Sequence, residues 1–177
     1  MKKLLYTLLA VSFIFTACKK EEGCTDAIAA NYNADAEDDD GSCTYSIIGV
    51  WTPTTVSGTS SMSATVMGQI VYTLDTTFTI TPTDEGWDLP TELEFTNTGT
   101  AIFTNEDGEL ETDSYTTSGS SLTITDSDGD TDNLTYTVTS SSLAILTSDT
   151  ETYTEDYMGQ EATIIESSDM TINCTRQ

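Results

Sequence analysis

The stretch Leu-Thr-Tyr-Thr-Val-Thr at residues 134–139 decides the fold class, because large apolar and polar side chains alternate throughout it. A period of two residues places the apolar side chains on one face of a β-strand, whereas an amphipathic helix needs a period of 3.6 residues. The pattern therefore predicts a sheet with one buried face and one face in water. The same period recurs in residues 78–80, 93–95, 122–125 and 143–145.

Turn-forming sequences separate these segments. Residues 97–99, 106–108 and 118–120 combine Gly with short polar residues, and residues 126–130 are an acidic run that contains Gly. Such sequences are typical of hairpin loops. Short strands at this spacing indicate an antiparallel meander that closes into a barrel or folds as a sandwich. Residues 57–68, rich in Gly, Ser and Met, are expected to be a loop or an irregular strand.

The first 17 residues have the properties of a secretion signal. Lys2 and Lys3 precede an uncharged apolar run from Leu4 to Ala17, which is shorter than the about 20 residues that a membrane-spanning helix requires. Ala17 stands directly before Cys18, and this arrangement resembles the lipobox of bacterial lipoproteins. The resemblance implies cleavage before Cys18, a diacylglycerol on its thiol and an acyl chain on its amine, which together would anchor the chain in a membrane. The alternative is an uncleaved segment with an incidental Cys.

Residues 19–22, Lys-Lys-Glu-Glu, follow the candidate anchor directly. They resemble the export signal of surface lipoproteins in the Bacteroidota, in which Lys and paired acidic residues follow the anchor Cys. The resemblance implies a lipid-anchored protein of the outer membrane that is exposed on the cell surface. An ordinary solvated charge cluster is the alternative.

The composition excludes several classes of function. The chain of 177 residues has 30 Asp and Glu against five Lys and Arg, and it contains no His. A surface with this charge repels nucleic acid and anionic lipid headgroups, so nucleic acid is not an expected partner. The absence of His removes the commonest general base and the commonest zinc ligand. No spacing singles out a catalytic pair of carboxylates, so we do not expect an enzyme.

Two cysteines bracket the acidic segment that follows the candidate anchor. Outside the cytoplasm Cys24 and Cys43 meet an oxidising environment, and a disulfide between them would stabilise the segment by roughly 3 kcal/mol. The segment has few apolar residues, so we expect it to depend on that bond. It resembles a Gly-Cys-Thr-Asp…Asn-Tyr-Asn…Asp-Asp-Gly-Ser-Cys module of exported flavobacterial proteins. We therefore divide the chain into a signal peptide at 1–17, a linker at 18–45 and a β domain at 46–177.

The linker also contains carboxylates that suit calcium. Asp35, Glu37, Asp38 and Asp40 are hard oxygen ligands of the kind that Ca²⁺ binds. An EF-hand alignment fails, because setting Gly41 at the sixth loop position puts Ile47 where the bidentate Glu should be. Two interpretations stand, a calcium site and a solvated spacer. The carboxylates of residues 126–132 pose the same alternatives, with a plain hairpin loop as the default.

Gly49 and Trp51 open the β domain with an Ile-x-Gly-x-Trp sequence. This motif resembles the first strand of the lipocalin-like β-barrels of Bacteroidota lipoproteins, and residues 94–101, 114–116, 121–124 and 142–145 continue the resemblance in order. It implies an up-and-down antiparallel barrel with an apolar interior, closed at one end by Trp51. Trp87, in a polar and turn-like setting, is expected to matter less to stability.

Arg176 is the only Arg of the chain, and it shares parity with Ile172 and Cys174 on the last predicted strand. That parity points the guanidinium toward the core side, and the lipocalin resemblance implies that it stacks on Trp51. The alternative is a frayed terminus with Arg176 in water. Cys174 is expected to be a buried free thiol.

Two functions fit a barrel of this kind. Eight-stranded barrels either hold one small ligand or are filled by their own side chains. The first hypothesis is a binding module for a small apolar or amphipathic ligand. The second is a structural or protein-interaction module, whose barrel is filled by residues such as Phe95, Tyr115 and Tyr136. An open apolar pocket of roughly 300 Å³ or more would favour the first. The sequence does not indicate an oligomeric state.

Overall fold

The computed structural model describes residues 20–82, 84 and 89–177. The described chain is all-β, as the period of two predicted, and it contains no helix that is long and apolar enough to cross a membrane. It divides into two compact units, Met1–Tyr45 and Ser46–Gln177. Cys18 and Trp87 lie outside the described residues.

The first unit is a short acidic segment that a disulfide closes. Cys24 and Cys43 are bonded, so the predicted pairing is confirmed. The unit's regular structure is one parallel pair of two-residue strands, β1 (Glu22–Gly23) and β2 (Asp38–Asp39). Among its described residues only Cys24 and Ala29 are buried apolar side chains. So little burial cannot offset the entropy of ordering the chain, which explains the need for the covalent link.

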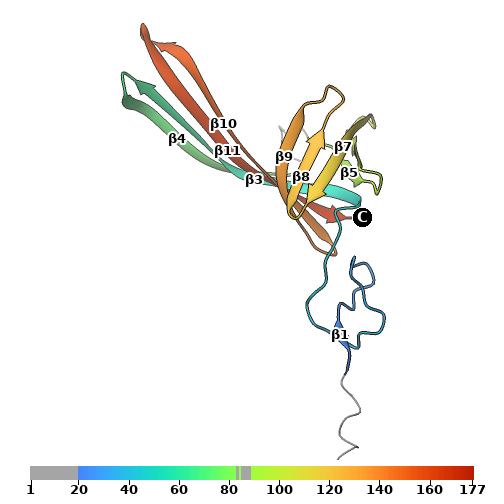
Figure 1. The fold of residues 1–177 in the computed structure, drawn as a ribbon. Helices are drawn as coiled ribbons and strands as arrows, with labels where there is room; N and C mark the ends of the chain where they lie inside the picture. The colour runs from blue at the N-terminus through green and yellow to red at the C-terminus, as the bar shows by residue number, and fades with distance from the viewer. Residues whose placement is uncertain (1–19, 83, 85–88) are drawn as a thin grey trace, which may run out of the picture. The chain divides into compact units, whose positions relative to one another are not determined.

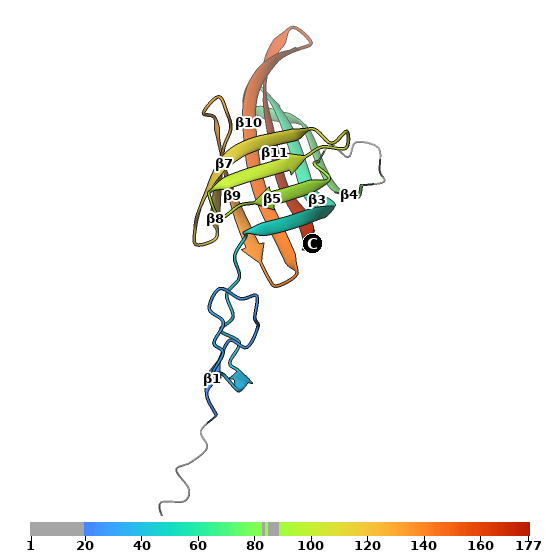
Figure 2. The ribbon, with the colours of Figure 1, turned by 90° about the vertical axis from the view of Figure 1, so that its right-hand side faces the viewer.

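Eight strands of the second unit form a closed antiparallel barrel (Figure 1 and Figure 2). From β5 to β11, each strand pairs with the next one in the chain. Closure comes from β3, which pairs with β11 on one side and with β5 on the other. A closed sheet leaves no free edge in the wall. The eight strands are β3 (Gly49–Val66), β5 (Glu92–Phe95), β6 (Thr100–Thr104), β7 (Leu110–Ser118), β8 (Ser121–Thr125), β9 (Thr131–Val138), β10 (Ser142–Tyr157) and β11 (Gln160–Arg176).

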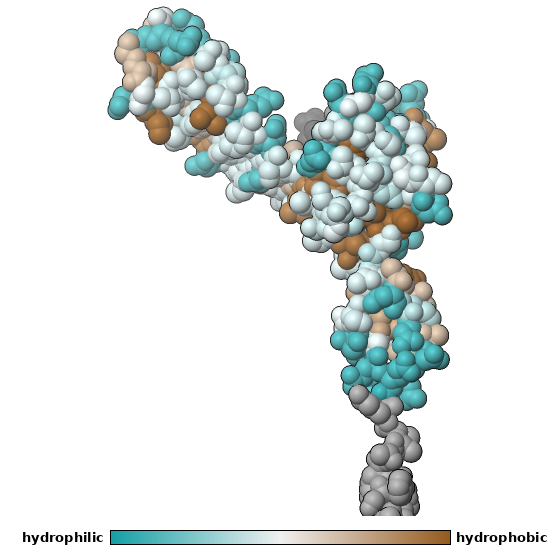
Figure 3. Space-filling model, viewed as in Figure 1, coloured by the Kyte–Doolittle hydropathy of each residue, from teal (hydrophilic) through white to brown (hydrophobic). Residues whose placement is uncertain are grey.

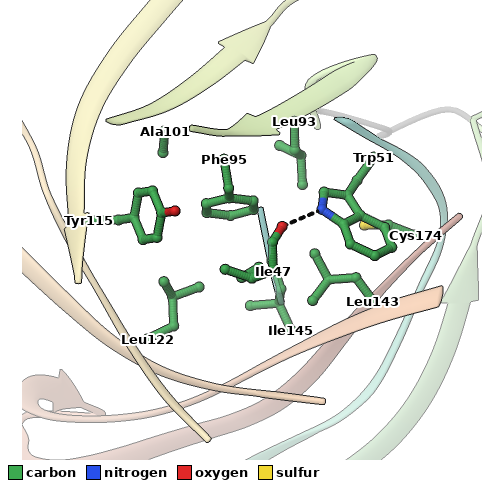
Figure 4. Close-up of a cluster of buried hydrophobic side chains, with 10 residues drawn as sticks. All are labelled: Ile47, Trp51, Leu93, Phe95, Ala101, Tyr115, Leu122, Leu143, Ile145 and Cys174. Atoms are coloured by element: carbon green, nitrogen blue, oxygen red, sulfur yellow. Dashed lines mark hydrogen bonds between the residues drawn. The ribbon is translucent and has the colours of Figure 1, made fainter. Parts of the chain in front are cut away.

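The core of the barrel is made by the residues that the alternation placed on the inner face. Leu122, Leu143 and Phe95 are at most 1% exposed. The rings of Phe95 and Tyr115 meet edge to face with centroids 5.0 Å apart, and the Tyr115 hydroxyl donates a hydrogen bond to the Thr96 carbonyl. Figure 4 shows the buried cluster, which comprises Ile47, Trp51, Leu93, Phe95, Ala101, Tyr115, Leu122, Leu143, Ile145 and Cys174.

The strands β3, β10 and β11 are long enough to extend beyond the barrel, and β4 (Gln69–Ile80) pairs with β3 there. In this extension β4, β3, β11 and β10 lie side by side in that order. We call this four-stranded extension, residues 57–79 and 147–170, the arm; it projects from the barrel in Figure 1. The pairing of β10 with β9 ends at Leu146, so beyond that residue the arm has left the wall.

The arm corrects the expectation for residues 57–68. Most of them are not a loop: residues 57–66 are the distal half of β3, paired with β4 and β11, with a shift of register against β4 at Ala64 and Thr65. Residues 67–68 form the turn that follows. The period of two is weak there because both faces of the arm meet solvent, so Ser and Thr occur on both. At Gly58 the backbone of β11 leaves no room for a side chain, since a Cβ on it would collide with the Asp169 carbonyl oxygen.

Two matching turns end the arm. Met67-Gly68 connects β3 to β4, and Met158-Gly159 connects β10 to β11. All four residues have positive φ, between 49° and 82°. Positive φ at both central residues is the property of the type I′ turn, which suits two-residue hairpins. Met is uncommon in this conformation, because its Cβ crowds the backbone. Both Met side chains are exposed, at 83% and 90%.

Candidate functional site

Trp51 lies near the start of β3, in the buried core of the barrel. Its side chain has no exposed surface, and its indole Nε1 donates a 2.8 Å hydrogen bond to the Ile47 carbonyl (Figure 4). A buried Trp needs such a partner for its N–H, because an unsatisfied donor is costly to desolvate. The indole is therefore fixed by the segment that leads into β3.

Arg176 stacks on that indole. Its Cζ lies 4.1 Å from the centroid of the Trp51 ring, which is the arrangement that the resemblance implied. The guanidinium donates three hydrogen bonds of 3.0 Å to backbone carbonyls. No carboxylate pairs with it, and the one ion pair of the described residues, Lys20–Asp38, is in the other unit. The accepting carbonyls are those of Ser46, Ile48 and Ser140.

Gly49 makes room for this contact. Its φ is +138°, and a Cβ there would lie 2.6 Å from Arg176 Nη1. A side chain at position 49 would therefore be strained in its backbone and would also displace the guanidinium. The sequence motif Gly-x-Trp is explained by the Arg that stacks above it. The three carbonyls that hold Arg176 could not be found from sequence, because backbone acceptors leave no residue-type signal.

Described residues bound a small cavity inside the barrel. Its volume is about 120 Å³, and its lining is apolar. It is less open than a second hollow of about 530 Å³, which lies outside the barrel at the base of the arm and is lined mostly by Ser and Thr. The lining of the interior cavity is Pro53, Leu89, Pro90, Leu93, Phe95, Phe103, Ile124, Leu134, Ile145 and Ile172.

Carboxylates gather near Asp113, on the face of β7 that bears Tyr115. Burial, and then repulsion from Glu111, Asp126 and Asp132, raise the pKa of Asp113 above its usual value. Close carboxylates of this kind disfavour an anionic group nearby.

Cys174 is a free thiol that points into the core. It is 2% exposed, and burial raises the pKa of its thiol to about 12. Because the thiolate is the reactive form, Cys174 behaves as a small apolar residue rather than as a nucleophile.

The structure does not bring the predicted calcium ligands together. Asp38 forms an ion pair with Lys20, at 2.9 Å, while Asp40 accepts a hydrogen bond from the Ser42 amide. Asp35 and Glu37 are part of the same solvent-exposed segment. In the part of the chain that the structure describes, no three His, Cys, Asp or Glu side chains are grouped as metal ligands would be.

The carboxylates of residues 126–130 shape a hairpin loop. Asp126 accepts hydrogen bonds from the amides of Asp128 and Asp130, each 2.9 Å long. A side chain that caps its own turn in this way needs no bound ion. In comparisons with known proteins, no family model matches the chain, and neither a curated protein nor a solved structure matches it.

Proposed function

We propose that the mature chain is a lipid-anchored, non-catalytic interaction protein of the outer membrane, exposed on the cell surface, whose barrel is a filled scaffold. The Ala17-Cys18 sequence and the Lys-Lys-Glu-Glu run after it support the anchor and the address. The absence of His supports a role other than catalysis.

The small volume of the interior cavity carries the proposal. At about 120 Å³ it is well below the roughly 300 Å³ at which pockets for drug-sized ligands begin. A dry apolar cavity of about 150 Å³ accepts molecules the size of benzene, but an acyl chain needs more room. The packing of Phe95, Tyr115 and Leu122 therefore favours a filled barrel over a ligand carrier.

The filled barrel can be tested on the mature chain carrying Cys18→Ser, purified without detergent. We expect native mass spectrometry to give the mass of the bare polypeptide, and a neutral naphthylamine dye to show no stoichiometric binding. Phe103→Ala, which enlarges the cavity, is the positive control and should admit the dye. A lipid bound to the wild-type barrel in equal stoichiometry would overturn the proposal and restore the ligand-binding hypothesis.

The anchor can be tested separately by growing cells with labelled palmitate. We expect the wild type and a Cys174→Ser variant to be labelled, because Cys174 is buried in the barrel. Cys18→Ser should remain unlabelled and accumulate as a precursor of higher mass. Labelling of Cys18→Ser would refute lipidation at this position.

A further inference from the structure

The arm has two sheet edges without a partner. Within the described residues, β4 pairs with β3 only, and β10 pairs with β11 alone beyond Leu146. An unpaired edge presents backbone N–H and C=O groups that can accept another strand. The arm is therefore open to strand addition on both sides, at β4 and at the distal half of β10.

The two edges are protected to different degrees. Over residues 147–157, β10 carries Asp149, Glu151, Glu155 and Asp156. Along its whole length, β4 carries only Asp75 as a charge, and it contains no Pro. The register of β3 and β4 shifts once, near the tip at Ala64 and Thr65. Since charges, Pro and bulges are the usual means of blocking an edge, β4 from Tyr72 onward is the unblocked one.

One face of β4 is rich in apolar side chains. The register places Tyr72, Leu74 and Phe78 on the face that continues the inner wall of the barrel. Tyr72 is 47% exposed and Leu74 is 45% exposed. Figure 3 shows hydrophobic residues (brown) on the arm among residues of intermediate hydropathy (white) and hydrophilic residues (teal). Exposed apolar surface that is concentrated in one place indicates an interaction site. The exposed apolar residues of the arm are Ile70, Val71, Tyr72 and Leu74 on β4, Met67 and Met158 in the turns, Tyr153 and Tyr157 on β10, and Ile165 on β11.

The charge of the arm selects among partners. The arm carries eight carboxylates and neither Lys nor Arg. A second copy of the chain would bring the same charges, and an anionic membrane surface would be repelled in the same way. A cationic polypeptide would be attracted. The eight carboxylates are those of Asp75, Asp149, Glu151, Glu155, Asp156, Glu161, Glu166 and Asp169.

We propose that β4 is a docking strand to which an extended, cationic segment of another protein adds as a further strand of the arm. The segment alternates apolar side chains with Lys or Arg. Its apolar side chains lie beside Tyr72, Leu74 and Phe78, and its cations lie on the opposite face, which carries Asp75. Backbone hydrogen bonds supply affinity and the alternating side chains supply specificity. This inference rests on the proposed function, because it names the surface through which a filled-barrel protein would interact.

The test uses the mature chain with Cys18→Ser and a fluorescein-labelled peptide of alternating Val and Lys, as long as β4. We expect saturable binding that weakens as salt is added, and none by the matching peptide of Val and Glu. The double variant Thr73→Lys, Thr77→Lys puts cations on the exposed β4 edge, and we expect it to weaken binding about tenfold or more.

The variant Thr150→Lys, Thr154→Lys is the matched control, because it changes the charge equally on the exposed edge of β10. We expect less than about a threefold effect from it, since only long-range attraction is reduced. Equal weakening by the two variants would overturn the assignment to β4. Both variants are checked for an unchanged urea midpoint, because exposed substitutions should leave the fold intact.

Hydrogen exchange identifies the contact directly. We expect the peptide to protect amides of residues 72–80 and to leave residues 147–157 unchanged. Protection of β10 or of the barrel strands instead would refute the docking strand, as would a β4-mediated dimer in sedimentation without peptide. Native mass spectrometry tests separately whether the barrel holds a ligand. A lipid found there would refute the filled barrel, whereas the peptide-binding and hydrogen-exchange results would still decide whether β4 is a docking strand.

Discussion

Trp51 and Arg176, which are far apart in the sequence, are in direct contact. The indole fills volume at the end of the core, and the guanidinium both stacks on it and satisfies three carbonyls. The two side chains therefore contribute to stability by different means, and substitutions should separate them.

We predict that Trp51→Ala lowers the free energy of unfolding by about 3–5 kcal/mol, because it empties a fully buried site. Arg176→Ala should cost less, about 0.5–2 kcal/mol, because it removes the cation–π contact and leaves carbonyls near solvent. Arg176→Lys should fall between the wild type and Arg176→Ala, since an ammonium cannot reach three acceptors in the plane of a guanidinium. Urea unfolding followed by circular dichroism measures all three. An unchanged midpoint for Trp51→Ala would contradict the assigned core.

A second prediction concerns Cys174 at alkaline pH. Its folded-state pKa is raised to about 12 from 9.0, so the folded state keeps a proton that the unfolded state loses. Stability from this group is fully present below pH 9 and is lost as pH rises toward the folded-state value. The urea midpoint of the wild type should therefore fall more steeply above pH 9 than that of Cys174→Ala. Tyrosines ionise in both proteins, so only the difference is diagnostic; parallel curves would show that the thiol is not desolvated.

At the scale of elements, the sequence predicted the barrel better than the arm. Leu122, Leu143 and Ile145 alternate with polar residues because only one face of their strands is buried, and that contrast is visible in the sequence. Residues 57–66 lack the contrast because solvent reaches both faces over much of the arm, so the pattern left a loop and an irregular strand as alternatives. The turns at 67–68 and 158–159 were missed because Met occupies a position that usually takes Asn or Gly.

Parity along the last strand placed Arg176 and Cys174 on the core side, and the structure agrees. The docking edge of β4 was not foreseeable, because a free edge is a property of the assembled sheet. Neither Tyr72 nor Leu74 differs in type from a core residue. Only the order of the strands shows that β4 has an outer edge without a paired strand and that these side chains are exposed there.

The two arm turns yield a third prediction. Met67 and Met158 adopt φ of 49° and 54°, a conformation that disfavours Met but suits Asn. We expect Met67→Asn and Met158→Asn each to stabilise the protein by about 0.5–1 kcal/mol, since neither removes a buried side chain. Differential scanning calorimetry of the single and double variants measures the gain. Met62→Asn, in a regular part of β3, is the control and should not stabilise. A loss of stability in the turn variants would mean that the exposed Met side chains pack against the tip.

For the whole molecule, the dominant property is charge. A formal net charge of −25 repels itself, and the compact state concentrates that repulsion. Dissolved salt screens charges over about 10 Å at 0.1 M. The folded protein should therefore be more stable in salt than without it.

Our fourth prediction is that raising NaCl from about 10 mM to about 0.5 M increases the unfolding midpoint, with most of the gain below about 0.2 M, where the screening length changes most. KCl at equal ionic strength should have the same effect, since screening does not depend on the identity of the monovalent cation. Micromolar CaCl₂ added at a constant NaCl concentration is the informative comparison, because it leaves the ionic strength almost unchanged. A much larger gain in micromolar Ca²⁺ would indicate a specific site and revive the calcium prediction for Asp35, Glu37, Asp38 and Asp40.

The pairing of β3 with β11, which closes the barrel and is called the seam here, also determines how long the barrel takes to form. The β3–β4 and β10–β11 hairpins need only local encounters around their Met-Gly turns. The seam must join positions such as Ile48 and Arg176, which are 128 residues apart. Distant pairings of this kind slow folding to about milliseconds or seconds. We therefore expect the two hairpins to form early and to remain unpaired with each other at first. The slow step is the pairing of β3 with β11, which closes the barrel wall and brings Arg176 into contact with Trp51.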